Sequence, residues 1–177
     1  MIKEAPLTIL LGNSLGGHVA LLYAKFHPEK VKGLIITGSS GLYENSMGDG
    51  YPKRGNYEYI KAKSEEVFYD PKIATKEIVD EVFESVNDRS KLIRTLAIAK
   101  SAIRHNMAKD LPTMHTTTAI IWGAQDGVTP PNVANEFNAL LPNSDLYWID
   151  KCGHAPMMEH PDRFNEIMDS WLKKYNI

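Results

Sequence analysis

The sequence has little that would tie it to an oxidising compartment, a bilayer or a nucleic acid. Cys152 is the one cysteine in 177 residues, so an internal disulfide is excluded and a reducing, cytoplasmic setting is expected. No apolar run reaches the length of a membrane span, and Met1–Pro6 has no signal-peptide pattern. The net charge of -2 gives no basis for binding a nucleic acid or an anionic membrane.

Clusters of metal ligands and internal repeats are lacking as well. No group of His, Cys, Asp or Glu has the spacing of a metal site, so neither a metal nor another cofactor is expected. Hydrophobic residues make up 43% of the chain and charged residues 24%, which is an ordinary globular composition. The length is sufficient for one domain with a substantial core.

The most informative stretch present is a strand, turn and helix pattern near the N-terminus. The apolar run Leu7–Leu11 is followed by GNSLGG, and apolar residues then recur at helical spacing over Leu15–His27. Ser14 would stand at the apex of this G-x-S-x-G turn as a candidate nucleophile, with the N–H of Leu15 placed to bind an oxyanion. An ordinary glycine-rich or phosphate-binding turn is the alternative.

Glycines flank the serine where the motif requires space. Gly12 and Gly16 are expected to leave room where side chains would collide. Gly17 is expected to let the helix approach the strand closely.

Three further apolar runs predict the rest of an α/β sheet. They cover Val31–Thr37, Thr118–Trp122 and Leu146–Ile149. One helical pattern with prolines at its start lies between the last two runs, and another follows the last run. A helix joins the first two strands, so these are expected to be parallel with a right-handed crossover. The fold class is therefore α/β, with about four parallel strands and flanking helices.

Residues 42–112 carry no strand pattern. A loop-rich stretch, Leu42–Asn56, is followed by three helical patterns, the first over Tyr57–Phe68. We interpret this stretch as a helical insertion, which divides the core into residues 1–41 and 113–177 within one domain. Helices that simply flank the sheet are the alternative.

Polar residues follow the predicted strands at the points where they end. Ser14 follows the first strand, Ser39 the second, Asp126 the third and His154 the fourth. Because the carboxyl ends of parallel strands meet at one edge, these side chains are expected to gather there. A serine needs a base to become a nucleophile and the base needs an orienting carboxylate, which predicts a Ser14–His154–Asp126 triad.

Several nearby residues offer competing assignments. His160 is a rival base but stands at a helix start, and Asp150 is a rival acid next to the histidine loop. His18, one helical turn beyond the serine, is interpreted as helix packing or pocket wall. Cys152 is expected to be a small buried residue rather than a second nucleophile.

Three residues are candidates for the pocket. They are Asn13, Ser39 and Arg104. Ser39 could equally belong to a solvated turn. Arg104 could clamp a substrate carboxylate or complement the dipole at the end of its helix.

Three blocks of sequence together carry a resemblance to a known family. GNSLGG resembles the nucleophile elbow of the α/β-hydrolase superfamily, WGAQDGVTPP its acid loop, and CGHAPMMEHPDRFN its histidine loop and final helix. The likeness is greatest to small esterases and to hydrolases of meta-cleavage products. It implies a helical cap over residues 42–112, a small-molecule ester substrate and no cofactor.

The family fold usually has further strands and an oxyanion loop before the elbow, and here only a few residues precede it. The sequence thus resembles about two-thirds of the family fold, either as a truncated gene product or as a minimal natural variant. Leu7–Leu11 would then be an apolar sheet edge, which predicts a homodimer formed by pairing two such edges.

Three functions are compatible with these features. The first is a carboxylesterase that cleaves small esters through an acyl-enzyme on Ser14. The second is a C–C bond hydrolase of meta-cleavage products, disfavoured because Ala155-Pro156-Met157 follows His154 where that group usually has a tryptophan. The third is a catalytically weak or inert truncated hydrolase that acts as a binding module, favoured by the missing oxyanion loop.

Overall fold

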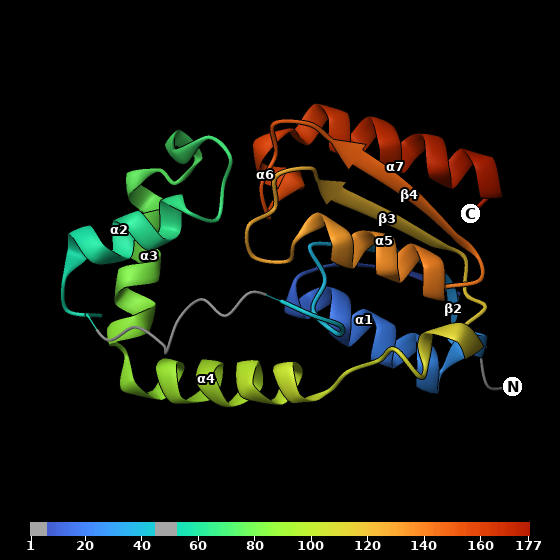
Figure 1. Ribbon diagram of the computed structural model, residues 1–177, viewed down its shortest axis with the longest axis horizontal. Coiled ribbons are helices and arrows are strands. Elements are labelled where there is room, and N and C mark those ends of the chain that lie inside the picture. The colour runs from blue at the N-terminus through green and yellow to red at the C-terminus, as the bar shows by residue number, and fades with distance from the viewer. Residues whose placement is uncertain (1–6, 45–52) are drawn as a thin grey trace, which may run out of the picture.

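A computed structural model describes residues 7–44 and 53–177 and contains one parallel four-stranded sheet in these ranges. The strands are β1 (Thr8–Asn13), β2 (Val31–Thr37), β3 (Thr118–Gly123) and β4 (Ser144–Ile149), and they lie in the order β1-β2-β3-β4. All three neighbouring pairs are parallel, which confirms the predicted fold class (Figure 1).

Strand β1 continues two residues further than the apolar run suggests. Gly12 lies opposite Ile36 and Asn13 lies opposite Thr37 in the register with β2. Backbone pairing with β2 therefore extends to the residue before Ser14, and helix α1 (Leu15–Phe26) begins directly after Ser14.

Helices cover both faces of the sheet. Helices α1 (Leu15–Phe26) and α5 (Pro131–Leu140) lie on one face, while α6 (Pro156–Glu159) and α7 (Pro161–Tyr175) lie on the other (Figure 1). Because side chains of a strand alternate between faces, each face has its own core. The α1 and α5 side contains Leu34, Ile36, Ile120, Trp122 and Phe137, and the α7 side contains Ile35, Ala119, Ile121, Phe164 and Trp171.

The segment between β2 and β3 is helical in its described residues. It contains α2 (Tyr57–Glu65), α3 (Lys76–Asn87) and α4 (Arg89–Arg104), and no strand occurs in the part of this segment that the structure describes. Figure 1 places α2 and α3 beyond the carboxyl ends of β3 and β4. Part of the predicted loop, at positions 45–52, lies outside the described residues.

Short 3-10 turns join several of these elements. They cover Pro28–Lys30, Pro71–Ile73 and Leu111–Thr113, and each begins at or next to a proline, whose fixed φ suits a first helical position.

One edge of the described sheet is apolar and exposed. On β1, Ile9 and Leu11 are 36% and 48% exposed, and Leu7 just before the strand is 59% exposed. Val19 and Phe26 on the adjoining helix α1 are also exposed, at 57% and 66%. The outer strand and its helix thus present a hydrophobic surface, which we call the β1 edge.

Candidate functional site

Ser14 occupies the sharp turn between β1 and α1. Its φ of 53° and ψ of -120° form a backbone conformation that residues other than glycine rarely adopt. The N–H of Ser14 donates to the carbonyl of Thr37 at 2.9 Å, and its own carbonyl accepts from the N–H of Ser40 at 3.1 Å. The end of β2 therefore holds this strained turn in place at the carboxyl edge of the sheet.

The glycines around Ser14 differ in whether a side chain would fit in their place. A Cβ at Gly12 would lie 2.3 Å from the backbone of Gly16, and a Cβ at Gly17 would lie 2.5 Å from the Oγ of Ser39. These contacts fit the roles predicted for both glycines. The prediction for Gly16 was wrong, because a Cβ there meets no atom within 4 Å.

Asp126 and His154 form a buried pair. The Nδ1 of His154 lies 2.9 Å from Oδ2 of Asp126 and 3.2 Å from Oδ1, and both side chains are almost fully buried. Burial removes competing water, so the carboxylate can fix the orientation of the imidazole ring. This contact joins the loops that follow β3 and β4.

The Asp126 carboxylate is itself fixed by its own loop. Oδ1 accepts from the N–H groups of Val128 and Thr129 at 2.8 and 3.0 Å, and Oδ2 accepts from the Thr129 hydroxyl at 2.8 Å. The Trp122 indole N–H donates to the Thr129 carbonyl and so anchors that residue to the core. Sequence reasoning missed Thr129, although a threonine three residues after an aspartate is a pattern for such a turn.

The backbone of His154 is fixed from two sides. Its N–H donates to the carbonyl of Val67 at 2.9 Å, which lies in the segment after α2. Its carbonyl accepts from Nδ2 of Asn13 at 3.0 Å, and the same amide also donates to the Thr37 carbonyl. The amide of Asn13, which was predicted as a pocket residue, links the serine turn to the histidine loop.

The imidazole of His154 lies directly over Gly38. A Cβ on Gly38 would stand 2.7 Å from Nδ1 of His154, and the φ of this glycine is 49°. Gly38 follows Thr37, whose carbonyl accepts from Ser14, so serine and histidine border the same short backbone stretch.

The structure brings Asp126 and His154 into contact and Ser14 to the same edge. No Ser14–His154 hydrogen bond forms among the described residues.

His18 lies one turn along α1 and pairs with a histidine of the helical segment. Its Nε2 lies 2.9 Å from Nδ1 of His105, and the two rings stack with centroids 5.2 Å apart. Burial lowers the pKa of His18, and the nearby His105 lowers it further. The packing role predicted for His18 therefore takes the form of a link between α1 and the end of α4.

Of the remaining pocket candidates, Ser39 does not lie in a solvated turn. It is fully buried, and its hydroxyl donates to the Ser40 carbonyl at 2.8 Å. A Cβ on Gly17 would collide with this side chain, so Ser39 fills the space between the end of β2 and α1.

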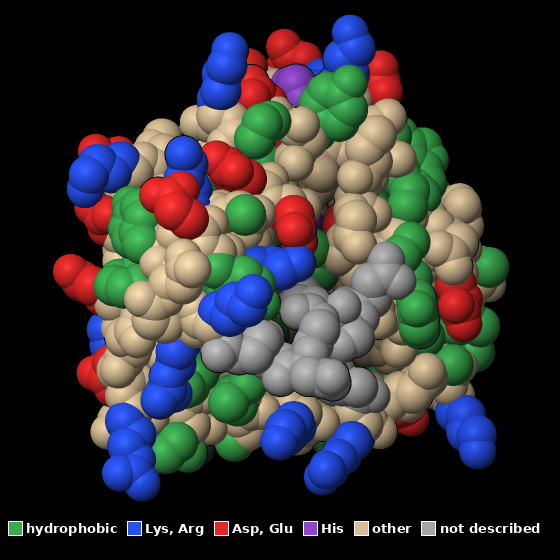
Figure 2. Space-filling view, turned by 60° about the vertical axis from the view of Figure 1, so that its left-hand side comes forward, with side chains coloured by type: hydrophobic (Ala, Val, Ile, Leu, Met, Phe, Trp, Pro, Cys, Tyr) green, Lys and Arg blue, Asp and Glu red, His purple; other side chains and the backbone are tan. Residues whose placement is uncertain are grey.

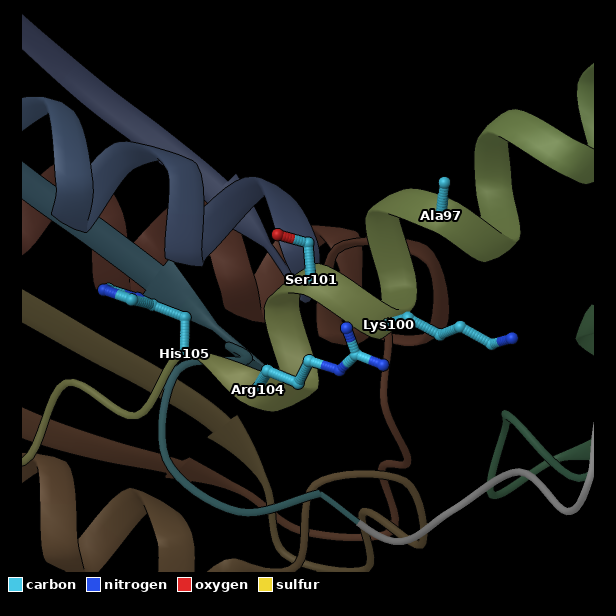
Figure 3. A pocket seen from close by; sticks show the side chains of 5 residues that line it. All are labelled: Ala97, Lys100, Ser101, Arg104 and His105. Atoms are coloured by element: carbon cyan, nitrogen blue, oxygen red, sulfur yellow. The ribbon is translucent and has the colours of Figure 1, made fainter.

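Arg104 lines a hollow of about 510 Å³ on α4. Ala97, Lys100, Ser101 and His105 complete its lining. In Figure 3 the side chains of Arg104 and Lys100 extend to the same side, while His105 points the other way. Figure 2 shows Lys and Arg side chains gathered in the lower half of the face that carries the helical segment. Two of the five residues that line this open hollow, Lys100 and Arg104, are cationic.

The rival residues are engaged elsewhere. Nε2 of His160 lies 2.9 Å from the carbonyl of Lys151, and Oδ1 of Asp150 accepts from the side chain of Gln125 at 3.0 Å. Cys152 is fully buried, and burial together with Glu159 raises the pKa of its thiol to about 12. Such a thiol carries almost no thiolate at neutral pH and is a poor nucleophile.

The described part of the chain contains neither a candidate metal site nor a candidate membrane-spanning helix. Within residues 7–44 and 53–177, no group of three His, Cys, Asp or Glu side chains could hold a metal ion. In the same ranges, no helix is long and apolar enough to cross a bilayer.

Comparisons with known proteins agree with this geometry. A model of the "Alpha/beta hydrolase family" matches residues 2–167. A 2-hydroxy-6-oxononadienedioate/2-hydroxy-6-oxononatrienedioate hydrolase of Pseudomonas sp is 27% identical over a match that covers 93% of this chain and 62% of the relative. The chain thus spans less than two-thirds of the length of this curated relative.

Solved structures show the same relation. An alpha/beta hydrolase enzyme from the metagenome of sediments of the lagoon of Mar Chica, Morocco, is 54% identical with a TM-score of 0.75, over 99% of this chain and 65% of that one. A serine hydrolase from Cycloclasticus zankles has a TM-score of 0.81 at 22% identity, over 96% and 64% of the two chains, and is similar in fold.

Proposed function

Because the chain belongs to the alpha/beta hydrolase family, we propose that it is a serine hydrolase of small carboxylic esters with Ser14, His154 and Asp126 as its catalytic triad. The observation that carries this proposal is the buried Asp126–His154 pair beside the strained Ser14 turn. All three residues come from loops at the carboxyl ends of parallel strands, where such sites are built.

The proposed reaction follows from the positions of the ring nitrogens. Nδ1 of His154 is engaged by Asp126, which leaves Nε2 to take the proton of the Ser14 hydroxyl. The serine oxygen attacks the ester carbonyl carbon, and His154 then passes the proton to the leaving alcohol. Water, activated by the same nitrogen, cleaves the acyl-enzyme to the carboxylic acid and restores Ser14.

The developing oxyanion needs hydrogen-bond donors. Leu15 is the first residue of α1, and the first N–H groups of a helix have no partner within it. We assign the N–H of Leu15 to this role, assisted by the partial positive charge of the helix N-terminus.

C–C bond hydrolysis of meta-cleavage products is the second candidate, and two observations favour it. The named relative acts on a dienedioate, and Arg104 and Lys100 line a hollow that suits a carboxylate. Ala155-Pro156-Met157 after His154 is the feature against it. Both candidates use the same nucleophile, so only substrate comparison separates them. Faster turnover of short p-nitrophenyl esters than of a meta-cleavage product would favour the esterase.

We expect a fluorophosphonate probe to label the purified full chain at Ser14. Labelling should disappear in Ser14→Ala and fall strongly in His154→Ala, because phosphonylation needs both the nucleophile and its base. Mass spectrometry of the labelled peptide identifies the residue. A folded wild-type protein that is not labelled would contradict the proposal and favour the hypothesis of an inert binding module.

The helical segment is proposed to act as a cap over the site. It supplies Val67, which binds the backbone of His154, and His105, which binds His18 on α1. Contacts at both places support the cap that was predicted from the sequence over residues 42–112. Such a cap would bound the substrate pocket and limit substrate size.

We also propose that a second copy covers the β1 edge. The exposed Leu7, Leu11 and Phe26 support this, since two outer strands related by a two-fold axis would extend the sheet and cover them. Sedimentation equilibrium at micromolar concentration should show a dimer for the wild type and a monomer for Leu11→Lys, which places a charge on the edge. A monomeric wild type over that range would contradict a homodimer.

A further inference from the structure

Glu159 joins the histidine loop to Tyr69, which lies 90 residues before Glu159 in the sequence. It is the last residue of α6, and it lies five residues beyond His154. One carboxylate oxygen, Oε1, accepts from the N–H of Gly153 at 2.6 Å. The other, Oε2, accepts from the N–H groups of Tyr69 and Asp70 at 2.8 and 3.3 Å.

The two ends of this bridge are functionally different. Gly153 immediately precedes His154 in the histidine loop, whereas Tyr69 and Asp70 belong to the proposed cap. Next to the bridge, the N–H of His154 donates to the Val67 carbonyl. Segment 67–70 is therefore bound to the histidine loop by one direct hydrogen bond, from His154 to Val67, and through the Glu159 carboxylate, which accepts two hydrogen bonds from segment 67–70 and one from Gly153.

The packing at this point leaves little freedom. A Cβ on Gly153 would lie 2.6 Å from the Val67 carbonyl oxygen and 2.9 Å from the Tyr69 nitrogen, so the two backbones touch directly. The Glu159 carboxylate accepts from three backbone N–H groups and, at 3.7 Å, from the Cys152 thiol. Because an ionised carboxylate has two acceptor oxygens, Glu159 can hold the donors of both backbones at once.

We propose that Glu159 is a positioning residue that couples the cap to the catalytic histidine. With the bridge closed, the Val67 carbonyl stays in reach of the His154 N–H and the imidazole stays against Asp126. With the bridge open, Tyr69 and Asp70 are released from Glu159, and the neighbouring hydrogen bond from His154 to the Val67 carbonyl is no longer held in place. This inference rests on the proposed function for its kinetic consequence, but the coupling between the two segments is a property of the fold.

Glu159→Gln in the full chain tests the coupling. The glutamine has nearly the same shape, but its amide nitrogen cannot accept a hydrogen bond, so one side of the bridge must open. Hydrogen exchange followed by mass spectrometry should become faster in peptides covering 67–70 and 152–155 together. Unchanged exchange, or faster exchange in only one of the two segments, would overturn the proposal.

The kinetic arm uses a short p-nitrophenyl ester with active sites counted by fluorophosphonate titration. We expect kcat per titrated site to fall about ten- to a hundredfold, since misplacement of a catalytic group by an ångström costs about that much, while KM stays within about twofold. A loss of folded protein alone would lower the number of titrated sites and leave kcat per site unchanged. That result would also overturn the positioning role.

Glu166→Gln is the matched control. Glu166 lies on α7, is exposed and pairs with Arg163 at 3.2 Å, so its substitution should change neither exchange nor kcat. If the wild type is not labelled by the probe, the proposed function fails. The exchange arm still decides whether Glu159 couples the two segments.

Discussion

Asp126→Asn is expected to lower kcat about 10⁴-fold with little change in the fold, because an amide in this position favours the wrong tautomer of His154, the histidine of the proposed triad. The Asp126 carboxylate accepts hydrogen bonds at both oxygens, from backbone and hydroxyl donors of its own loop and from His154. The backbone N–H groups of Val128 and Thr129 hold the amide oxygen at the Oδ1 position. The amide NH₂ of the variant then faces Nδ1 of His154.

A ring nitrogen that faces an NH₂ group must accept a hydrogen bond, so its proton moves to Nε2. With Nε2 protonated, His154 cannot take the proton of Ser14. Steady-state hydrolysis of a short p-nitrophenyl ester measures the loss, and circular dichroism verifies the fold. An Asp126→Asn variant with kcat within about tenfold of the wild type would remove Asp126 from the proposed triad.

Asp150→Asn provides the control for this experiment. Asp150 is the other aspartate near the histidine loop, it is exposed, and it accepts from Gln125. The Gln125 hydrogen bond, together with the backbone N–H of Lys151, lowers the pKa of Asp150. We expect kcat of this variant to remain within about twofold of the wild type, since losing an exposed polar contact has a small effect.

Gly12→Ala should lower the free energy of unfolding by about 3 kcal/mol or prevent folding, because the added methyl group overpacks a backbone contact. Its Cβ would lie 2.3 Å from the carbonyl carbon and oxygen of Gly16 and 2.5 Å from the nitrogen of Gly17. Backbone atoms cannot rotate away as a flexible side chain can. The start of α1 would have to shift away from β1, and the Ser14 turn between them would be distorted.

Gly16→Ala tests the same motif with the opposite expectation. Gly16 is exposed, has no positive φ, and an added Cβ meets nothing within 4 Å. Alanine within a helix is favoured over glycine by about 0.5–1 kcal/mol, so this variant should be as stable as the wild type or more stable. Urea unfolding of both variants measures the difference. Equal destabilisation by the two substitutions would contradict the close approach at Gly12.

Local sequence patterns were sufficient for the order of the four strands and the longer helices. The apolar run Val31–Thr37 has the bounds of β2, and the GNSLGG turn marks the start of α1. These features depend on residues close together in sequence, namely apolar runs, prolines at helix starts and glycines in a tight turn. For the same reason, placing Ser14, Asp126 and His154 after strands indicated one common edge.

The partners of these residues were decided by tertiary structure. The amide of Asn13 binds the carbonyl of His154, 141 residues away, and the N–H of His154 donates to the carbonyl of Val67. Ser39 was open to a solvated turn, yet it is buried because α1 approaches β2 closely at Gly17.

The same holds for the links between the helical segment and the core. His18 pairs with His105, and Glu159 binds the backbone of Tyr69. Neither partner can be identified from local patterns, because a hydrogen-bonding side chain accepts many partners of similar chemistry. Sequence by itself thus determined which chemical groups the chain brings to the edge of its sheet. Only the three-dimensional packing of distant segments decided which groups hold them there.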